Sequence, residues 1–467
     1  MMRIKTYKVL LGLAVPFLLQ SCFVAKNYER PEVETENLYR TDEISLDSTS
    51  LGMVSWKDLF NDPILKGHID NALANNLDIR VAIQQIAATE AYLKQGKAGN
   101  YPTLGISATA SRTENSENGQ FGAAAASEAV ELFDLSAQLS WEADIWGKIR
   151  SNKRAFQATY LQSIEAHKAV KTELVAVVAS MYYQLLSLDQ QLKITKETII
   201  TRQDGLETTK ALKEAGMLTE VAVQQTAALL YAAQSIQIDI ENQTKILENA
   251  FSILLGEPAH AIERGVLENQ QITTDLVTGV PYLLLQNRPD VLAAEFGLIN
   301  TFELTNVARS SFYPSITLGA TAGFQSMELD QWLDASSFFN TLVGGLVQPV
   351  LNGRKIRTQF EVSKAQQEQA LLNYKKALLT AGQEVSDALY TYEATTDKIV
   401  LKEKEYQAYK LASEYSEELL NQGLANYLEV LNAQENVLNS QLALVNNKYL
   451  QLNAIVNLYQ ALGGGWR

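Results

Sequence analysis

The chain has 467 residues, a single cysteine, and 53 acidic against 39 basic residues, which gives a formal net charge of −14. This acidic balance argues against a nucleic-acid partner, because phosphate groups are bound by clustered lysine and arginine side chains. No stretch after residue 21 approaches the roughly 18 unbroken apolar residues that a membrane-spanning helix needs.

The first element in chain order is a secretory signal over residues 1–21. Three basic residues precede an apolar run from Val9 to Leu19, and a small residue, Ser21, follows. This order of segments is typical of an exported protein. The sequence Leu-Gln-Ser-Cys that ends at Cys22 resembles the lipobox of bacterial lipoproteins, so we expect Cys22 to become the lipidated first residue. A buried, unmodified cysteine is the alternative.

The rest of the chain is internally duplicated. Tyr101-Pro102 opens a strand-like segment, and Tyr313-Pro314 opens a second one, 313 − 101 = 212 residues later. Gly216 and Gly423 each follow a long helix-forming stretch, at an offset of 423 − 216 = 207. The order and spacing predict one strand–strand–helix–helix unit per copy. The expected segments are an N-terminal extended segment at 22–60, a first repeat at 61–280 and a second repeat at 281–467.

Four segments alternate between apolar and polar residues, as strands do. They are expected at about 101–112, 131–146, 313–325 and 338–351, and the fourth is less clear because both of its faces are apolar. Such alternation fits a half-buried sheet of a soluble protein or a membrane barrel. The acidic residues on the polar face of the second strand, Asp134, Glu142 and Asp144, favour a barrel with a water-filled lumen. Four strands cannot close such a barrel, and open edges are forbidden in lipid, so several chains must share it.

The two remaining segments are very long helical hairpins, expected at 147–255 and 353–461. No proline lies between residues 103 and 257 or after 349, and proline breaks helix interiors. At about 1.5 Å per residue, the first helix of each hairpin would be about 100 Å long. Gly216 and Gly423 are expected to end these first helices, because glycine is a common helix stop.

Together these features resemble the TolC-type outer-membrane efflux proteins, in particular the lipoprotein branch that works with resistance-nodulation-division (RND) pumps. The resemblance covers essentially the whole mature chain. The segments that carry it are the Cys22 junction, Trp56-Lys57-Asp58-Leu59-Phe60-Asn61-Asp62-Pro63, Ala74-Asn75-Asn76-Leu77-Asp78, Leu254-Leu255-Gly256, Asn287-Arg288-Pro289-Asp290 and Gln348-Pro349-Val350-Leu351-Asn352-Gly353.

The resemblance implies an α+β membrane protein that acts as a homotrimer. Each chain contributes four strands to a trimeric 12-stranded β-barrel in the outer membrane, continued by a long α-helical coiled-coil barrel in the periplasm. The implied partners are a periplasmic adaptor (membrane fusion) protein, an inner-membrane RND pump and outer-membrane lipid. No cofactor and no metal are implied.

The resemblance also implies site residues. Glu429 stands where the family has an acidic constriction residue, whereas Asn432 replaces a second aspartate of some members. Ala425 stands where one member of the family has an arginine in the network that closes its tunnel. The resemblance therefore does not predict which contacts close the tunnel in this chain. The adaptor-docking tips would be formed by Gly216 and Thr219 in the first hairpin and by Gly423 and Asn426 in the second.

Two other classes of protein fit the sequence less well. The three histidines are dispersed in sequence, and no catalytic or nucleotide-binding motif occurs, so we expect no enzyme. A periplasmic coiled-coil structural or adaptor lipoprotein would explain Cys22 and the long helices, but not the four strands or the duplication. The sequence therefore favours a passive exit duct for drugs, metals or other toxic compounds, and it does not name the cargo.

Overall fold

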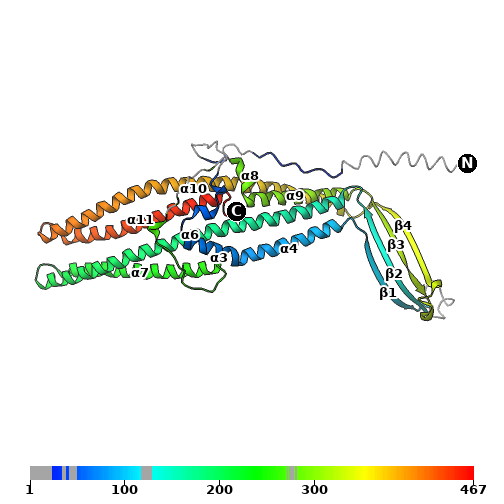
Figure 1. Cartoon of the computed structure of the whole chain (residues 1–467), viewed down its shortest axis with the longest axis horizontal. Coiled ribbons are helices and arrows are strands. Elements are labelled where there is room, and N and C mark those ends of the chain that lie inside the picture. The colour runs from blue at the N-terminus through cyan, green and yellow to red at the C-terminus, as the bar shows by residue number, and fades with distance from the viewer. Residues whose placement is uncertain are drawn as a thin grey trace. The chain divides into compact units, whose positions relative to one another are not determined.

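A computed structural model describes residues 24–33, 38–40, 50–116, 129–270, 272, 278 and 281–467. Within these residues the chain contains one four-stranded sheet and is otherwise largely helical (Figure 1). The described residues form two compact units. Unit 1 takes its residues from 1–31, 86–162 and 295–373, and unit 2 from 32–85, 163–294 and 374–467. Each unit therefore contains parts of both predicted repeats.

The sheet belongs to unit 1 and is antiparallel throughout, with the strand order β1-β2-β3-β4. Its strands are β1 (Thr103–Thr113), β2 (Val130–Ala143), β3 (Ser315–Ser326) and β4 (Phe338–Val347). The strand order follows the chain order, so β1 and β4 are the two edges of the sheet. β4 ends two residues before Pro349, which has no backbone N–H to donate to a neighbouring strand.

The register of the four strands separates apolar from polar rows. Leu104, Leu139, Ala320 and Leu342 are paired in one row across the whole sheet. The adjacent row on the opposite face contains Gly105, Gln138, Thr321 and Thr341. Because side chains alternate along a strand, one face of the sheet is mainly apolar and the other mainly small and polar.

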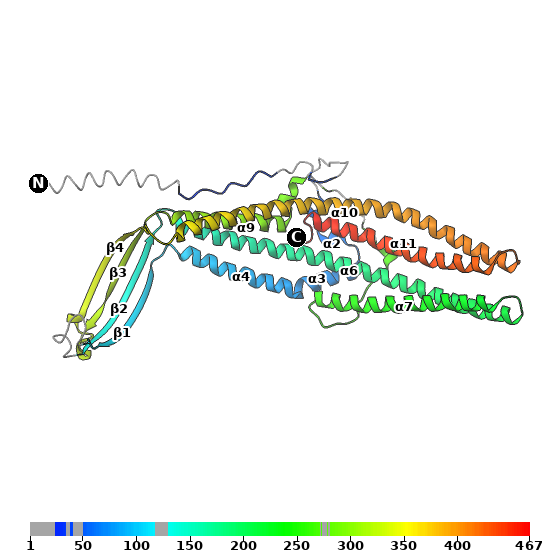
Figure 2. The ribbon, with the colours of Figure 1, turned by 180° about the vertical axis from the view of Figure 1, so that it is seen from behind.

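The helices confirm the duplicated fold, because the three main helices of each half have equal lengths. The 22 residues of α4 (Leu77–Ala98) correspond to the 22 of α9 (Pro289–Ser310). The 67 residues of α6 (Lys148–Glu214) correspond to the 67 of α10 (Lys355–Asn421), and the 35 of α7 (Glu220–Leu254) to the 35 of α11 (Tyr427–Ala461). Figure 2 shows α7 returning beside α6 and α11 beside α10.

Shorter elements complete the described part of the chain. They are α2 (Trp56–Leu59), α3 (Pro63–Asn75), α8 (Leu284–Asn287) and the 3-10 turns Leu51–Met53, Leu267–Asn269, Pro281–Leu283, Leu329–Gln331 and Ala335–Ser337. Among the residues that the structure describes, no helix is both long enough and apolar enough to cross a membrane.

The core of unit 2 joins residues 50–60 to the C-terminal end of α11. The buried ring of Phe60 makes edge contacts with Tyr183 of α6 and Tyr459 of α11, with centroids 6.4 Å apart in both cases. A Cβ atom at Gly52 would lie 2.3 Å from the carbonyl oxygen of Leu462. The Tyr459 hydroxyl donates to the Val54 carbonyl at 2.8 Å. The C-terminal end of α11 is thus packed tightly against residues 50–60.

Asp62 is a second anchor of this core. Its carboxylate accepts the N–H of Ile64 at 2.8 Å and so caps α3, and it also accepts the hydroxyl of Tyr182 at 2.6 Å and the Gln270 side-chain amide at 2.8 Å. Partial burial alone would raise the pKa of Asp62, but these hydrogen bonds outweigh it and lower the pKa below its usual value.

Candidate functional site

The two hairpin tips in unit 2 are built by the same backbone motif. In the first tip Gly216 has φ +77°, its N–H donates to Lys213 O at 2.9 Å, and the N–H of Met217 donates to Leu212 O at 2.9 Å. The same pair of bonds, at 2.9 and 2.8 Å, surrounds Gly423, whose φ is +71°. Glycine is favoured at both positions because this helix-ending motif requires a left-handed residue.

The tips differ in how the returning helix begins. Thr219 precedes α7 and makes no side-chain capping bond, whereas the Asn426 side chain accepts the N–H of Leu428 at 3.1 Å. The first tip instead has an ion pair of 3.0 Å between Lys213 and Glu220. Both of these side chains are largely exposed, so the pair contributes little to stability.

A cleft of about 750 Å³ lies between the two tips, and its walls include Thr219, Gly423 and Asn426. The structure thus brings three of the four predicted docking residues together, while the fourth, Gly216, is adjacent to the lining residue Met217. Met217 is 72% exposed. Such exposed apolar side chains around a cleft are typical of a surface that binds a partner.

The predicted constriction residues lie just beyond this cleft. Glu429 is in the first turn of α11 and Asn432 follows three residues later, and both side chains are exposed in the single chain. Ala425 lines the cleft itself. The role of Glu429 at a constriction stays a prediction, because it depends on how several chains meet.

Tyr427 is a tip residue that the sequence did not reveal. Its hydroxyl lies 2.7 Å from Thr209 Oγ1 of α6 and 2.7 Å from Thr226 Oγ1 of α7. Tyr427 lies 218 residues after Thr209 and 201 after Thr226 in the chain, and no motif connects it with them. This cluster links the beginning of α11 to both helices of the first hairpin.

The sheet in unit 1 has aromatic residues toward both of its ends. Trp146 stacks on Tyr313 with centroids 4.9 Å apart, and Trp332 lies 5.9 Å from Phe133. Phe324 comes eleven residues after Tyr313, which corresponds to about 36 Å along a strand. At the ~40° tilt of barrel strands, this gives a height of about 28 Å, close to the ~25 Å apolar band between the aromatic girdles of outer-membrane barrels.

One expectation about the polar face of β2 needs correction. Asp144 lies beyond the end of β2, and its carboxylate accepts the N–H groups of Ile149 and Arg150, both at 2.9 Å. It therefore caps the first turn of α6 instead of belonging to the strand face. Asp134 remains on that face, where it accepts the Ser136 hydroxyl at 2.7 Å.

The signal segment and Cys22 lie outside the described residues, but the chain that follows them is fixed to α9. The Lys26 N–H donates to Asn306 Oδ1 at 3.1 Å, and Asn306 Nδ2 donates back to Lys26 O at 2.9 Å. The Val24 carbonyl lies 3.4 Å from the Arg309 guanidinium, next to the end of α9. We call residues 24–30 the N-terminal strap.

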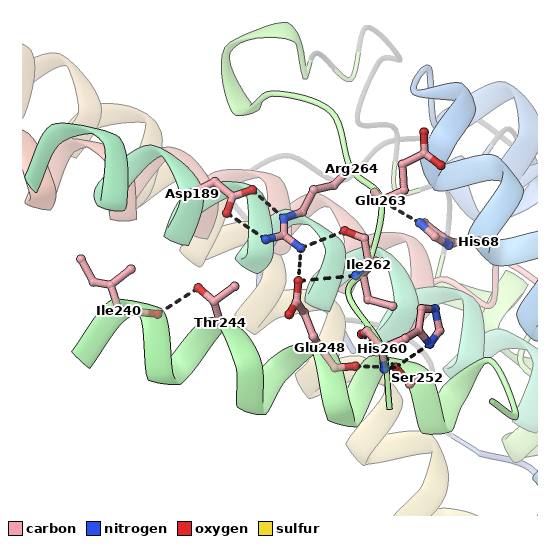
Figure 3. A network of polar contacts seen from close by, with 10 residues as sticks. All are labelled: His68, Asp189, Ile240, Thr244, Glu248, Ser252, His260, Ile262, Glu263 and Arg264. Carbon is pink, nitrogen blue, oxygen red and sulfur yellow. Dashed lines mark hydrogen bonds and ion pairs between the residues drawn. The ribbon is translucent and has the colours of Figure 1, made fainter. Parts of the chain in front are cut away.

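A polar clamp fixes the loop that follows α7 (Figure 3). Arg264 donates to Asp189 of α6 at 2.5 and 2.9 Å, and to Glu248 of α7 at 2.5 Å. The hydrogen bonds to Asp189 raise the pKa of Arg264, and the bond to Glu248 raises it further, although burial acts in the opposite direction. His68 donates to the Glu263 carbonyl at 2.8 Å. Among the described residues no group of three or more His, Cys, Asp or Glu side chains could hold a metal ion.

A duplicated chain with a membrane-type four-stranded sheet and two long helical hairpins defines the TolC-like class of outer-membrane channels. The chain belongs to the outer membrane efflux protein family, whose model matches residues 68–257 and 280–464. The members of this family are outer-membrane efflux channels.

Individual relatives agree with this assignment. The chain is 27% identical over 458 residues to the solvent efflux pump outer membrane protein SrpC of Pseudomonas putida, with 96% of each chain covered. It is 28% identical to the outer membrane protein OprJ of Pseudomonas aeruginosa, with 97% of this chain and 95% of OprJ covered. The predicted efflux role in the outer membrane is thereby confirmed.

Solved structures of the same fold cover nearly the whole chain. A membrane protein from Pseudomonas aeruginosa superposes with a TM-score of 0.85 at 27% identity, over 95% of this chain and 97% of that one. The channel CusC superposes with a TM-score of 0.83 at 25% identity, over 94% of this chain and 99% of that one. The predicted TolC-like fold is confirmed.

Proposed function

We propose that three copies of this chain form the outer-membrane exit duct of a tripartite efflux system. The observation that carries the proposal is the four-stranded sheet of unit 1, which has one apolar face and one polar face but ends at two edges, β1 and β4. Unpaired edges are not tolerated in lipid. Three copies joined β4 to β1 would close a barrel of 3 × 4 = 12 strands, with the small polar residues lining a water-filled lumen.

The partners would meet the duct at the helical tips. A periplasmic adaptor would bind the cleft around Thr219 and Asn426, because that cleft combines exposed apolar walls with accessible polar groups. An inner-membrane RND pump would supply the energy, and the duct would conduct passively. The cargo would be drugs, metals or other toxic compounds. Relatives named for solvent, toluene and antibiotic efflux support organic compounds among these.

Glu429 would form a ring of three carboxylates at the periplasmic mouth, with Asn432 one turn further along α11. Such a ring would attract cations, because low-dielectric walls focus the field of clustered charges.

The lipid anchor on Cys22 is supported by the N-terminal strap. Val24 lies beside Arg309, near the end of α9 and only a few residues before β3 begins. The strap thus holds Val24, the first described residue, beside the end of α9 and near the Trp146–Tyr313 stack, where aromatic residues mark a membrane interface.

The decisive experiment uses the mature chain extracted from membranes in detergent. We expect a heat-sensitive trimer on gels, ion conductance in planar bilayers, and an acylated cysteine at residue 22 by mass spectrometry. Photo-crosslinkers at Thr219 and Asn426 should capture a purified adaptor, whereas the same crosslinkers in the loop at 112–130 should not. A monomer without conductance would favour a periplasmic structural or adaptor lipoprotein instead.

A further inference from the structure

The two helices of the first hairpin, α6 and α7, bury a shared row of side chains. On α6 this row contains Leu206 and Thr209, and on α7 it contains Val223, Thr226 and Leu230. Their spacing of three and four residues places each set on one side of its helix. Tyr427 of α11 is inserted at the tip end of this row through its contacts with the two threonines.

The Tyr427 hydroxyl can be removed without leaving the threonines unsatisfied. Thr209 also bonds to the Gly205 carbonyl at 2.7 Å, and Thr226 to the Ala222 carbonyl at 2.8 Å. These bonds lie within one helix each and persist if α11 moves away. The contacts of Tyr427 are therefore a separable tie between the hairpins, and we call them the hydroxyl tie.

Arg202 lies on the same face of α6, two helical turns from Thr209, and its guanidinium lacks most of its hydrogen-bond partners. Arg202 is only 5% exposed, and its Nη1 donates to the Leu229 carbonyl of α7. Within the described residues, its Nε and Nη2 atoms have no hydrogen-bond partner. Burial lowers the pKa of Arg202, and the charge of Glu435 on α11 offsets this only in part. A buried guanidinium with unpaired N–H groups opposes the packing that buries it.

We propose that Tyr427 and Arg202 set the position of α11 in opposite directions: the hydroxyl tie holds α11 against the first hairpin, and the buried guanidinium favours its release. Movement of α11 away from α6 and α7 breaks the tie and admits water to Arg202. The inference rests on the proposed function, because the first turn of the same helix contains Glu429, the residue proposed to line the mouth of the duct. The hydroxyl tie would then replace the closing network that this chain lacks, because it has Ala425 at the position of the arginine in that network.

The test compares two variants with opposite expected effects, using the full-length mature trimer in planar bilayers. Tyr427→Phe removes only the tie, and the loss of one net hydrogen bond corresponds to an increase of roughly fivefold per protomer in the open-to-closed ratio. Arg202→Met keeps an unbranched side chain of similar length but removes the buried charge, so conductance should fall. Tyr231→Phe and Lys210→Met, at exposed positions of α7 and α6, are the matched controls and should resemble the wild type.

Hydrogen–deuterium exchange of the same trimers reports on α11 without requiring conduction. Tyr427→Phe should speed exchange in the peptide that covers residues 427–440, and Arg202→Met should slow it. Unchanged exchange in Tyr427→Phe would overturn the tie, and faster exchange or higher conductance in Arg202→Met would overturn the opposing role of the guanidinium. A wild-type trimer that conducts no ions would instead refute the proposed function, so the two failures are distinguishable.

Discussion

The clamp at Arg264 gives a prediction whose size follows from the contacts. Arg264→Met removes the two bonds to Asp189 and the bond to Glu248, and leaves two carboxylates without their cation. The Arg264 and Glu248 side chains are only 15% and 13% exposed, whereas Asp189 is 39% exposed. Breaking a buried pair costs about 3–5 kcal/mol, and screening at Asp189 reduces the expected loss to about 2–4 kcal/mol.

This loss should appear as local opening of the loop after α7. Three amides of the loop report on it, because His260, Ile262 and Gly265 donate their N–H groups to the side chains of Ser252, Glu248 and Tyr182. Their exchange with deuterium should be faster by about 30- to 700-fold, since each 1.4 kcal/mol is a factor of ten.

The measurement is hydrogen–deuterium exchange of peptides from residues 256–266, in the detergent-extracted protein. Arg357→Met removes an exposed positive charge from α10 and serves as the control. Arg264→Lys keeps the charge but cannot form the two-pronged bond to Asp189, so it should recover only part of the protection. If exchange in Arg264→Met matched that of the Arg357→Met control, the clamp would contribute nothing to the order of the loop.

Three further predictions concern the sheet, the core and the mouth. Gly323→Ala would place a Cβ atom 2.1 Å from the carbonyl oxygen of Leu135, so the heat-sensitive trimer should be lost on gels, while Gly105→Ala, with open space around it, should preserve it. Hydrogen bonds hold the pKa of Asp62 below its usual value, so Asp62→Asn should lower Tm at pH 7, and this difference should shrink as pH falls below about 4 and the wild-type carboxylate takes up its proton. Glu429→Gln should weaken cation selectivity and block by multivalent cations in planar bilayers without changing trimer yield; unaltered values would place the constriction elsewhere.

The elements that depend on local sequence were predictable. Alternating residues such as Leu104 and Gly105 located the strands, and Gly216 and Gly423 ended the long helices because a left-handed turn needs glycine. The contacts that join distant segments were not predictable. Tyr427 looked like an ordinary helix residue, since its partner Thr209 lies more than two hundred residues earlier.

The prediction that Asp144 belongs to the polar face of β2 was wrong for a related reason. Asp144 continues the alternation of the strand, and the pattern alone does not reveal that the strand ends at Ala143 and that the carboxylate turns to the N–H groups of α6. Arg202 was hidden in the same way, because one arginine in a helix rich in charged residues has no sequence signal for burial.

The interleaving of the two units has a consequence for the order in which the chain can fold. Unit 1 lacks β3 and β4 until residues up to 347 have been made and exported, and unit 2 lacks the end of α11 until the last residues arrive. Gly52 packs on Leu462, so the segment around residue 52 cannot complete its packing until the end of the chain has been made. During that interval the edge of β2 that later pairs with β3 is free, and unpaired edges invite aggregation. The duplicated order of the elements therefore leaves an unpaired sheet edge open to aggregation until the second half of the chain has been made.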